Sequence, residues 1–311
     1  MHVPRIYAKA SLSGWSPTWE TLWDAYEDDL PAEIWDAGID GVEVAIPIVG
    51  DDEEDAETIE RLERWAEPWL DEGLAVVPHP YTEGPANPAS CVDRDATEPA
   101  RSLLRVFETA ADFSREVGLP VTVTYHAAKA AGEDAPSREV LVERSARFFE
   151  LANDLLADVT GPVSVVNESQ LPADRDGDTI RIGDVPDEIV ETSWDFPRVG
   201  VCWDTGHYRL ANQRLGAPEQ PPDKFIRKVT HMHLHDVIDD TDHEPPSEGL
   251  DRLSEEIELA VEEGKLSSLT LEYDYGKAVA EANDAEALLD YLAETAVWVH
   301  HSAGTELEIV E

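Results

Sequence analysis

Eight short apolar runs, rich in β-branched residues, alternate along the chain with stretches of helical periodicity. Such alternation is typical of βα units, in which a helix carries the chain back so that successive strands lie parallel. This pattern constrains the fold more than any other feature of the sequence. The expected strands occupy residues 5–8, 41–46, 74–79, 121–126, 163–168, 199–204, 229–234 and 268–273.

The segments between the strands carry helix signals of their own. Apolar side chains form one broad stripe between residues 100 and 117, and another between 137 and 157, where Ser137 is a candidate N-cap. Gly73 and Gly118 stand just before expected strands, at positions where a helix commonly ends. The chain between consecutive strands is therefore expected to be helical.

Both a closed barrel and an open, doubly wound sheet are compatible with this alternation. Dinucleotide-binding sheets carry a GxGxxG turn after the first strand, and phosphate-binding NTPases carry a Walker loop; the sequence contains neither. It also contains no linker, internal repeat or low-complexity tract, and 311 residues suit one barrel domain. We therefore predict an α/β protein with a single (β/α)8 TIM barrel that spans residues 1–311.

The charge of the chain is unusual for a globular protein. Aspartate and glutamate total 68 against 23 lysines and arginines, which gives a formal net charge of −45. High charge can indicate disorder, but 42% of the residues are apolar and they occur in regular blocks. Acids spread over predicted helices and loops instead predict a halophilic surface. A nucleic-acid partner is not expected, because the sequence shows no basic patch.

Two further features bear on the compartment. The N-terminal residues lack a basic stretch followed by an apolar run, and no segment reaches the length of a membrane span. Cys91 and Cys202 lie far apart and outside any CxxC motif, so we expect two reduced, buried thiols in preference to a disulfide. The sequence thus predicts a soluble, cytoplasmic protein with no membrane partner.

Side chains that commonly bind metals gather at the carboxyl ends of the expected strands. Barrel enzymes place their catalytic groups at that rim. His231, His233 and His235 alternate along one strand, so their side chains are expected to point to the same face. The other residues of this kind are His79, His126, Glu168, Asp204, His207 and Glu272, with His243 in an acidic loop after the seventh strand.

Three of these residues are carboxylates that would repel one another in a partly desolvated pocket. Because Glu168, Asp204 and Glu272 meet at one rim, a cation is needed to offset their charge. Oxygen donors combined with imidazole suit Mn²⁺, Mg²⁺ or Co²⁺, with Zn²⁺ as a further candidate. Acids in loops are otherwise expected to be solvated surface; after the seventh strand these are Asp239, Asp240, Asp242 and Glu244.

Five motifs, in matching order and spacing, make the chain resemble the xylose isomerase-like TIM barrels, a family of sugar phosphate isomerases and epimerases that includes AP endonuclease family 2. The motifs are Asn167-Glu168-Ser169, Asp204-Thr205-Gly206-His207, His233-Leu234-His235-Asp236, the segment from His243 to Gly249, and Leu271-Glu272-Tyr273. The resemblance implies four metal ligands, namely Glu168, Asp204, His233 and Glu272. It also implies that His207 supports a ligand or contacts the substrate. Ser247 departs from the family, which often has glycine there.

The resemblance favours isomerisation or epimerisation of a free sugar or polyol. A divalent metal chelated by neighbouring carbonyl and hydroxyl oxygens acidifies the C–H between them and stabilises the enediolate. As in the family's epimerases, Glu168 and Glu272 are expected to act as the acid/base pair on opposite sides of the substrate. His207, with Lys129 or Arg175 from nearby loops, is expected to orient hydroxyl groups.

A multi-zinc phosphodiesterase that resembles endonuclease IV is the alternative. His79, His126 and His243 fall in the order of that group's additional ligands, so they are expected to bind further metal or the substrate. Thr241 replaces an aspartate of that group, and the negative charge disfavours DNA, so we favour the isomerase or epimerase. An inosose-type dehydratase also stays open, because its first step forms an enediolate too. Barrels of this family are often dimers or tetramers, so a homo-oligomer is compatible with the resemblance.

Overall fold

A computed structural model describes residues 4–12, 17–93, 96–172, 178–246, 250–279 and 284–305. Its centre is one parallel sheet of eight strands, in the order β3-β2-β1-β12-β9-β8-β6-β4. The strands are β1 (Arg5–Ser11), β2 (Gly41–Ile48), β3 (Ala75–Thr82), β4 (Val121–His126), β6 (Val163–Glu168), β8 (Val199–Asp204), β9 (Val229–Leu234) and β12 (Ser268–Leu271).

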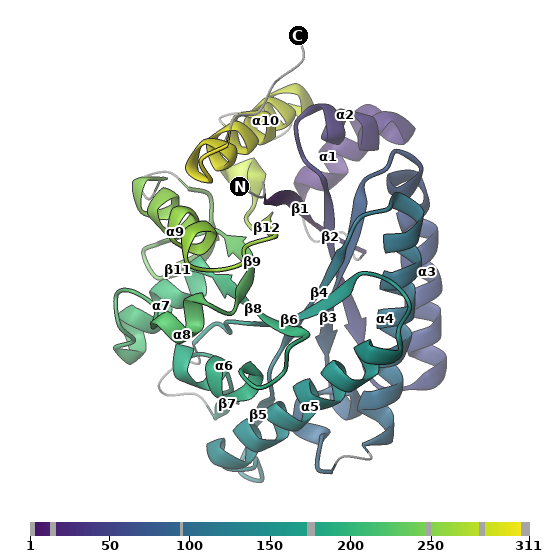
Figure 1. The fold of residues 1–311 in the computed structure, drawn as a ribbon. Coiled ribbons are helices and arrows are strands. Elements are labelled where there is room, and N and C mark those ends of the chain that lie inside the picture. The colour runs from purple at the N-terminus through teal and green to yellow at the C-terminus, as the bar shows by residue number, and fades with distance from the viewer. Residues whose placement is uncertain are drawn as a thin grey trace.

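The sheet curls into a nearly closed barrel. Neighbouring strands pair in parallel register from β3 round to β4, and these two end strands lie against each other. Figure 1 shows the chain running round the barrel in sequence order, with helices on the outside. The predicted (β/α)8 barrel is confirmed, and all eight expected strands are present.

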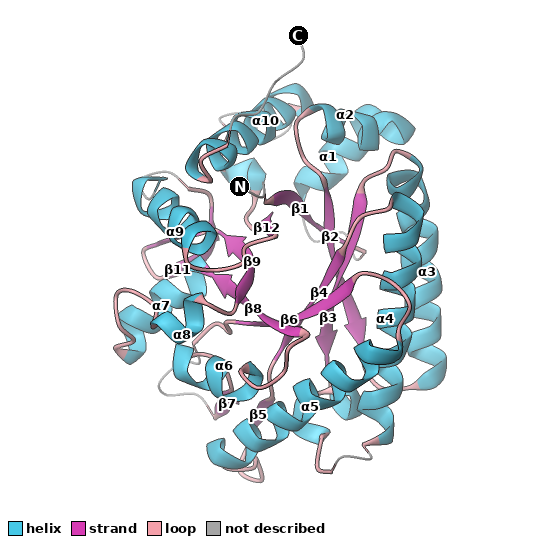
Figure 2. Cartoon of the chain, in the orientation of Figure 1, coloured by secondary structure: helices cyan, strands magenta, loops and turns pink. Residues whose placement is uncertain are grey.

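Helices cover the outside of the barrel (Figure 2). The two apolar stripes form α4 and α5, and Gly118 ends α4 in the left-handed conformation, with φ of 69°. The helices are α1 (Pro17–Tyr26), α2 (Leu30–Asp36), α3 (Asp52–Asp71), α4 (Thr97–Val117), α5 (Arg138–Asp158), α6 (Pro186–Ser193), α7 (Thr205–Leu215), α8 (Asp223–Ile226), α9 (Leu250–Glu262) and α10 (Ala285–Ser302).

The apolar core lies between the strands and the inward faces of these helices. On α4 and α5, Phe107 and Phe148 are buried and pack edge-on against Tyr125 of β4, with ring centroids 6.3 and 5.4 Å apart. Edge-to-face packing of buried rings adds to the stabilisation from removing apolar area from water. Both cysteines are buried and free, as expected. None of the helices in the described ranges is long and apolar enough to cross a bilayer.

Two short antiparallel ribbons, which the sequence did not predict, stand beyond the barrel strands. β5 (Lys129–Ala131) pairs with β7 (Thr179–Arg181), and β10 (Asp236–Ile238) pairs with β11 (Thr241–Glu244). Asp239 and Asp240 turn the second ribbon with φ of 49° and 67°. Aspartate tolerates this left-handed conformation, which tight hairpin turns require. The ribbons decide which side chains surround the rim of the barrel.

Candidate active site and metal centre

Four buried side chains converge at the carboxyl ends of the barrel strands. Glu168 and Asp204 end β6 and β8, His233 lies in β9, and Glu272 follows β12. One ligand atom of each lies within 4.8 Å of the others. Parallel strands bring their carboxyl ends to one rim, so residues far apart in sequence become neighbours. These are the four residues that the family resemblance implied as metal ligands.

Each of the four carries a buried polar atom that lacks a hydrogen-bond partner among the described residues. The atoms are Glu168 Oε2, Asp204 Oδ2, His233 Nδ1 and Glu272 Oε2. Buried polar atoms without hydrogen bonds are costly, and carboxylates that face one another also repel. His233 Nδ1 contacts Glu272 Oε2, but this contact is an ion pair only when the ring is protonated. A divalent cation would satisfy all four atoms and offset the charge, so the donor set fits a metal. Three carboxylates and one imidazole suit Mn²⁺, Mg²⁺ or Co²⁺.

Glu43 of β2 supports His233 from the floor of the barrel. The carboxylate is fully buried, and its Oε1 lies 3.0 Å from His233 Nε2. His231 Nε2 lies 3.1 Å from Glu43 Oε2, and the Thr270 hydroxyl donates to the same oxygen. With its Nε2–H directed at Glu43, His233 presents Nδ1 to the three acids. A carboxylate behind a histidine commonly fixes the tautomer of a metal ligand in this way.

Asp204 is held in an equally definite orientation. Its Oδ1 accepts from the backbone N–H of His207 at 2.7 Å and lies 2.8 Å from His235 Nε2. His235 Nδ1 accepts from the backbone N–H of His243 at 2.9 Å, so the proton of this ring is on Nε2 and points to Asp204. Oδ2 faces the cluster, and His207 Nδ1 lies 3.0 Å from it. His235 therefore helps to position Asp204, with Nδ1 bonded to the backbone and Nε2 close to Oδ1.

Lys9 of β1 holds Glu272 from below. Its ammonium lies 2.7 Å from Glu272 Oε1, 2.7 Å from His79 Nδ1 and 3.5 Å from Glu43 Oε1. The ion pair occupies one oxygen of Glu272, and Oε2 faces the cluster. Lys9 also offsets the charge of Glu43, which is the one acid of this group that lies outside the proposed ligand set.

The other histidines named from the sequence surround this cluster. His79 and His126 approach Glu168 Oε2, with Nε2 atoms 3.2 and 3.6 Å away. His207 Nδ1 lies 2.9 Å from the carbonyl oxygen of Ser169. On the ribbon β10–β11, His243 stacks on His235 with ring centroids 4.4 Å apart. All four therefore lie at the rim, as predicted.

The electrostatics of the rim keep the carboxylates ionised. Burial alone raises the pKa of Glu168, but His126, His233 and His79 outweigh it and hold the pKa well below its usual range. For Glu272, burial is likewise outweighed by His233 and Lys9, and its pKa is also well below the usual range. Burial lowers the pKa of His126 to about 4, so this ring is neutral near pH 7. Burial lowers the pKa of His233, but Cys202, Glu272 and Glu43 outweigh it and hold this pKa well above its usual range. A metal bound by the ionised acids would therefore displace a proton from this ring.

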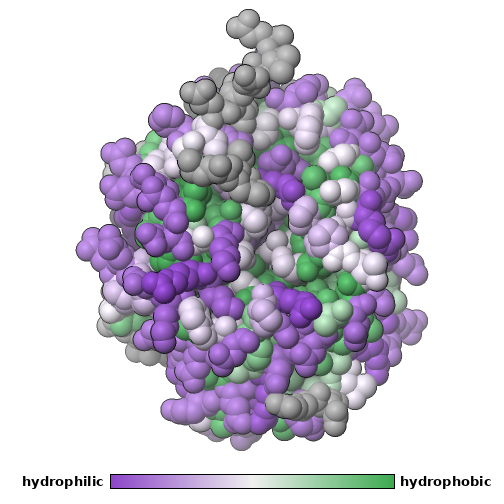
Figure 3. Space-filling model, in the orientation of Figure 1, coloured by the Kyte–Doolittle hydropathy of each residue, from purple (hydrophilic) through white to green (hydrophobic). Residues whose placement is uncertain are grey.

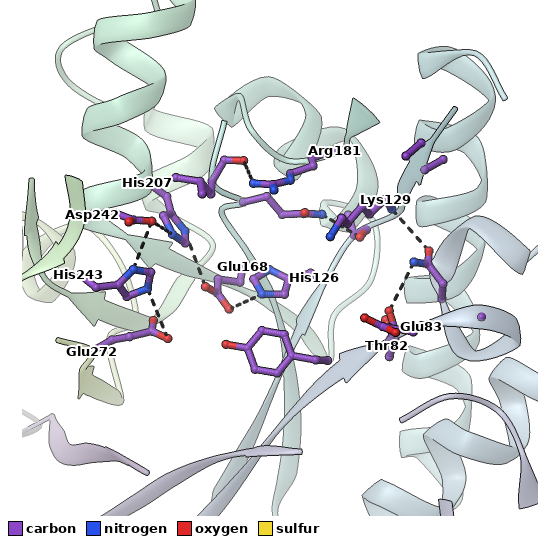
Figure 4. Close-up of a pocket in the computed structure, with 18 residues that line it drawn as sticks. Thr82, Glu83, His126, Lys129, Glu168, Arg181, His207, Asp242, His243 and Glu272 are labelled. Carbon is purple, nitrogen blue, oxygen red and sulfur yellow. Dashed lines mark hydrogen bonds and ion pairs between the residues drawn. The ribbon is translucent and has the colours of Figure 1, made fainter. Parts of the chain in front are cut away.

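A cavity of ≈ 500 Å³ opens above the cluster (Figure 4). Glu168 and Glu272 line its inner end, and His126, His207 and His243 lie round them. Its outer wall includes Lys129 and Arg181 from the ribbon β5–β7 and the exposed Glu83. The volume is in the range of small-molecule sites. Lys129 thus lies at the site as predicted, whereas Arg175 and Ser247 lie outside the described residues.

The sequence matches the profile of the xylose isomerase-like TIM barrel family over residues 31–295. The chain belongs to this family. The D-psicose 3-epimerase of Clostridium cellulolyticum H10, solved with D-tagatose, is similar with a TM-score of 0.56 and 13% identity, over 93% of this chain and 96% of that chain. A xylose isomerase domain protein from Alicyclobacillus acidocaldarius has a TM-score of 0.56 and 16% identity, over 96% and 99% of the two chains.

A D-allulose 3-epimerase from Methylomonas sp., solved with D-allulose, has a TM-score of 0.50 and 16% identity, over 95% of this chain and 96% of that chain. At such identities the likeness shows the fold. No curated protein sequence matches the chain significantly. Membership of the xylose isomerase-like family therefore rests on the sequence profile, and the solved structures agree with it.

Several side chains at this family site were missed or misjudged from the sequence. Glu43 and Lys9 were not considered, although each is a charged residue inside an apolar strand, which is a recognisable signal of a buried role. Asp242 was expected to be solvated surface, which is wrong: it lines the cavity, with Oδ2 3.2 Å from His243 Nδ1. Glu244 pairs with Lys277 at 2.5 Å. The turn of the ribbon moves these two acids inward and leaves Asp239 and Asp240 exposed.

Proposed function

We propose that the chain is a divalent-metal-dependent sugar isomerase or epimerase. The observation that carries the proposal is the cluster of four unsatisfied ligand atoms at the floor of a cavity, in a member of the xylose isomerase-like family. Three solved relatives of the same fold are named as sugar 3-epimerases, two of them solved with a ketose. Neutral or anionic sugars with adjacent carbonyl and hydroxyl groups suit such a site.

A bound divalent cation would supply positive charge to sugar oxygens and make the neighbouring C–H more acidic. Glu168 and Glu272 are the two proposed ligands that line the cavity, and they come from the ends of different strands, so one can remove the proton and the other can return it. Lys9 holds Glu272 and His79 holds Glu168, which fixes both carboxylates before the substrate arrives. His207 lines the cavity beside them and can orient a hydroxyl group.

The phosphodiesterase alternative needs further metal ions among the outer histidines. His207, His235 and His243 bring ring nitrogens within 4.8 Å of one another. His235 Nδ1 accepts a backbone N–H, and its Nε2 lies 2.8 Å from Asp204 Oδ1 but forms no hydrogen bond among the described residues. His79, His126 and Glu168 form a further group that could hold a metal ion. The metal stoichiometry therefore distinguishes the two functions.

The test is proton exchange at the carbon next to the carbonyl of a ketose, measured by NMR in deuterated water with D-tagatose and D-allulose as probes. Glu272→Gln should lower the exchange rate by about 10²-fold to 10⁴-fold, the contribution of one general acid/base. Glu244→Gln, at an acid that pairs with Lys277 outside the cavity, should exchange at the wild-type rate.

Elemental analysis of the same samples separates loss of catalysis from loss of metal. We expect one equivalent of Mn²⁺, Mg²⁺ or Co²⁺ per chain in the wild type. Normal exchange in metal-loaded Glu272→Gln would contradict the proposed role of Glu272. Several zinc equivalents in the wild type, with no exchange, would favour the phosphodiesterase.

A further inference from the structure

Two basic side chains line the same cavity as the proposed metal ligands. Lys129 of β5 and Arg181 of β7 are register partners across the antiparallel ribbon. Side chains of directly opposed residues project from the same face of a ribbon. Both line the cavity. Lys129 stands across the cavity from Glu272 and His243 (Figure 4), with Arg181 beside it on the ribbon.

Neither basic side chain has an acidic partner among the described residues. Arg101, Arg138 and Arg209 each pair with a carboxylate. Lys129 and Arg181 form no ion pair within the described ranges. Like charges directly opposite each other on a ribbon are destabilising. An anion bound between the two would remove that cost.

Arg181 is anchored through one nitrogen of its guanidinium, while another nitrogen has no hydrogen-bond partner among the described residues. One nitrogen, Nη1, donates to the carbonyl oxygen of Leu171 at 2.9 Å. Nε is buried and has no hydrogen-bond partner among the described residues. Arg181 also lines the cavity, and a guanidinium is suited to an oxyanion, which accepts two of its N–H groups at once.

The ribbon itself is tied to the barrel, so the two charges cannot separate by a shift of its strands. The backbone N–H of Ile182 donates to the carbonyl oxygen of Ala128 at 2.9 Å. The buried amide of Gln170 donates to the carbonyl oxygens of Ala127 and Ile182, at 2.8 and 2.9 Å. These bonds fix the height of the ribbon above the end of β6.

We propose that Lys129 and Arg181 bind an oxyanion, a phosphate ester or a carboxylate, at the end of the substrate remote from the metal cluster. The substrate class is then a sugar phosphate or a sugar acid, and not a neutral ketose. A cavity of ≈ 500 Å³ has room for a sugar chain that joins the two ends. This inference rests on the proposed function in one respect, because it takes the cluster of four ligands as the reacting end.

Binding of compounds that cannot react tests the subsite alone. Glucitol and glucitol 6-phosphate have no carbonyl group, so neither can be isomerised. Their affinities are measured by titration calorimetry at constant salt, with Mn²⁺ present. We expect glucitol 6-phosphate to bind about tenfold more tightly than glucitol, or better, the gain typical of a charge-assisted hydrogen bond. This ratio should fall about tenfold in Lys129→Met and in Arg181→Met.

Lys224→Met is the matched control, because Lys224 lies near Trp194 and outside the cavity. It should keep the wild-type ratio. Gluconate, which carries a carboxylate in place of the phosphate ester, identifies the anion: the compound whose gain depends on Lys129 and Arg181 has the preferred group.

Equal affinity for all three compounds in the wild type would overturn the proposal, and so would a gain that both variants retain. The wild-type ratio requires no variant, so a folding defect cannot hide this outcome. Failure of this proposal can be told apart from failure of the proposed function. An isomerase of neutral sugars would show proton exchange but no preference for anions. An anion-binding barrel without isomerase activity would prefer anions but show no proton exchange.

Discussion

Asp204 shows how single atoms prepare the proposed metal site. The same carboxylate caps α7 through the backbone of His207 and lies 2.8 Å from His235 Nε2 through its Oδ1, while Oδ2 faces the cluster. Gly206 makes this arrangement possible. A Cβ at position 206 would lie 2.1 Å from Cε1 and 2.2 Å from Nδ1 of His235, so the ring can stand where it does only above glycine.

Gly206→Ala should therefore weaken metal binding. The methyl group displaces His235 and frees Asp204 to rotate, and loss of such an orienting contact typically lowers metal affinity by about 10-fold to 100-fold. Alanine raises helix propensity by up to about 1 kcal/mol relative to glycine, so a loss cannot come from α7 itself. Competition with a fluorescent chelator measures the affinity for Mn²⁺.

The double variant Gly206→Ala, His235→Ala is the control for that mechanism. Once the ring is gone, the added methyl group has nothing to displace, so it should cost no further affinity beyond His235→Ala alone. Additive losses in the double variant would show that Gly206→Ala acts by another route.

The four proposed ligands could be named from the sequence because each lies at the end of a recognisable strand. A charged residue inside an apolar strand indicates that Glu43 and Lys9 are buried, but nothing local shows which residues they contact beneath the site. Their contacts join residues such as Lys9 and Glu272 that are far apart in sequence. Such pairs follow from closure of the barrel, and not from any pattern within one segment.

At the scale of elements, the strands and helices were predictable and the ribbons were not. Strands of six or more residues and long helices carry enough positions to show a period, as α4 and α5 do. The ribbon β10–β11 has strands of three and four residues, which are too short to show an alternation of apolar and polar residues. From the sequence alone, its turn at Asp239 and Asp240 looks like an acidic loop. The ribbon nevertheless determines where Asp242 and His243 lie.

Helix α9 contains a carboxyl group whose ionisation should weaken the fold. Burial raises the pKa of Glu256 to about 7 from the ordinary 4.5, although the adjacent Arg252 lowers it. Arg252 donates to Oε1 at 2.8 Å, while Oε2 is buried without a partner among the described residues. Because the folded pKa is raised, the stability from this group is fully present below about pH 4.5 and is lost as the pH rises through 7.

Urea denaturation at pH 5 and pH 8 measures this effect. The free energy of unfolding of the wild type, relative to that of Glu256→Gln, should fall by about 2 kcal/mol between the two pH values. Glu258→Gln is the matched control on the exposed side of α9 and should follow the wild type. A difference between wild type and Glu256→Gln that does not change with pH would show that Glu256 titrates normally.

The molecule as a whole combines an apolar barrel with a surface of acids. Figure 3 shows hydrophilic residues over most of the outer edge of the molecule in the face drawn. On α3 the inward residues Ile59, Leu62 and Trp69 are buried, whereas Glu53 and Glu57 on the other side are exposed. The net charge of −45 is thus spread over the outside, where each acid repels many others.

This charge should make the folded state depend on salt. At about 1 M salt the screening length is roughly 3 Å, so repulsion between neighbouring surface acids is largely removed; in dilute buffer it extends over tens of ångströms. We expect the far-UV helical signal to be lost on dialysis from molar potassium chloride into dilute buffer, and to return when salt is restored. Mn²⁺ is kept constant on both sides so that metal loss does not contribute. An unchanged spectrum and melting temperature in dilute buffer would mean that burial in the barrel core outweighs the repulsion without screening, and the halophilic interpretation of the sequence would be wrong.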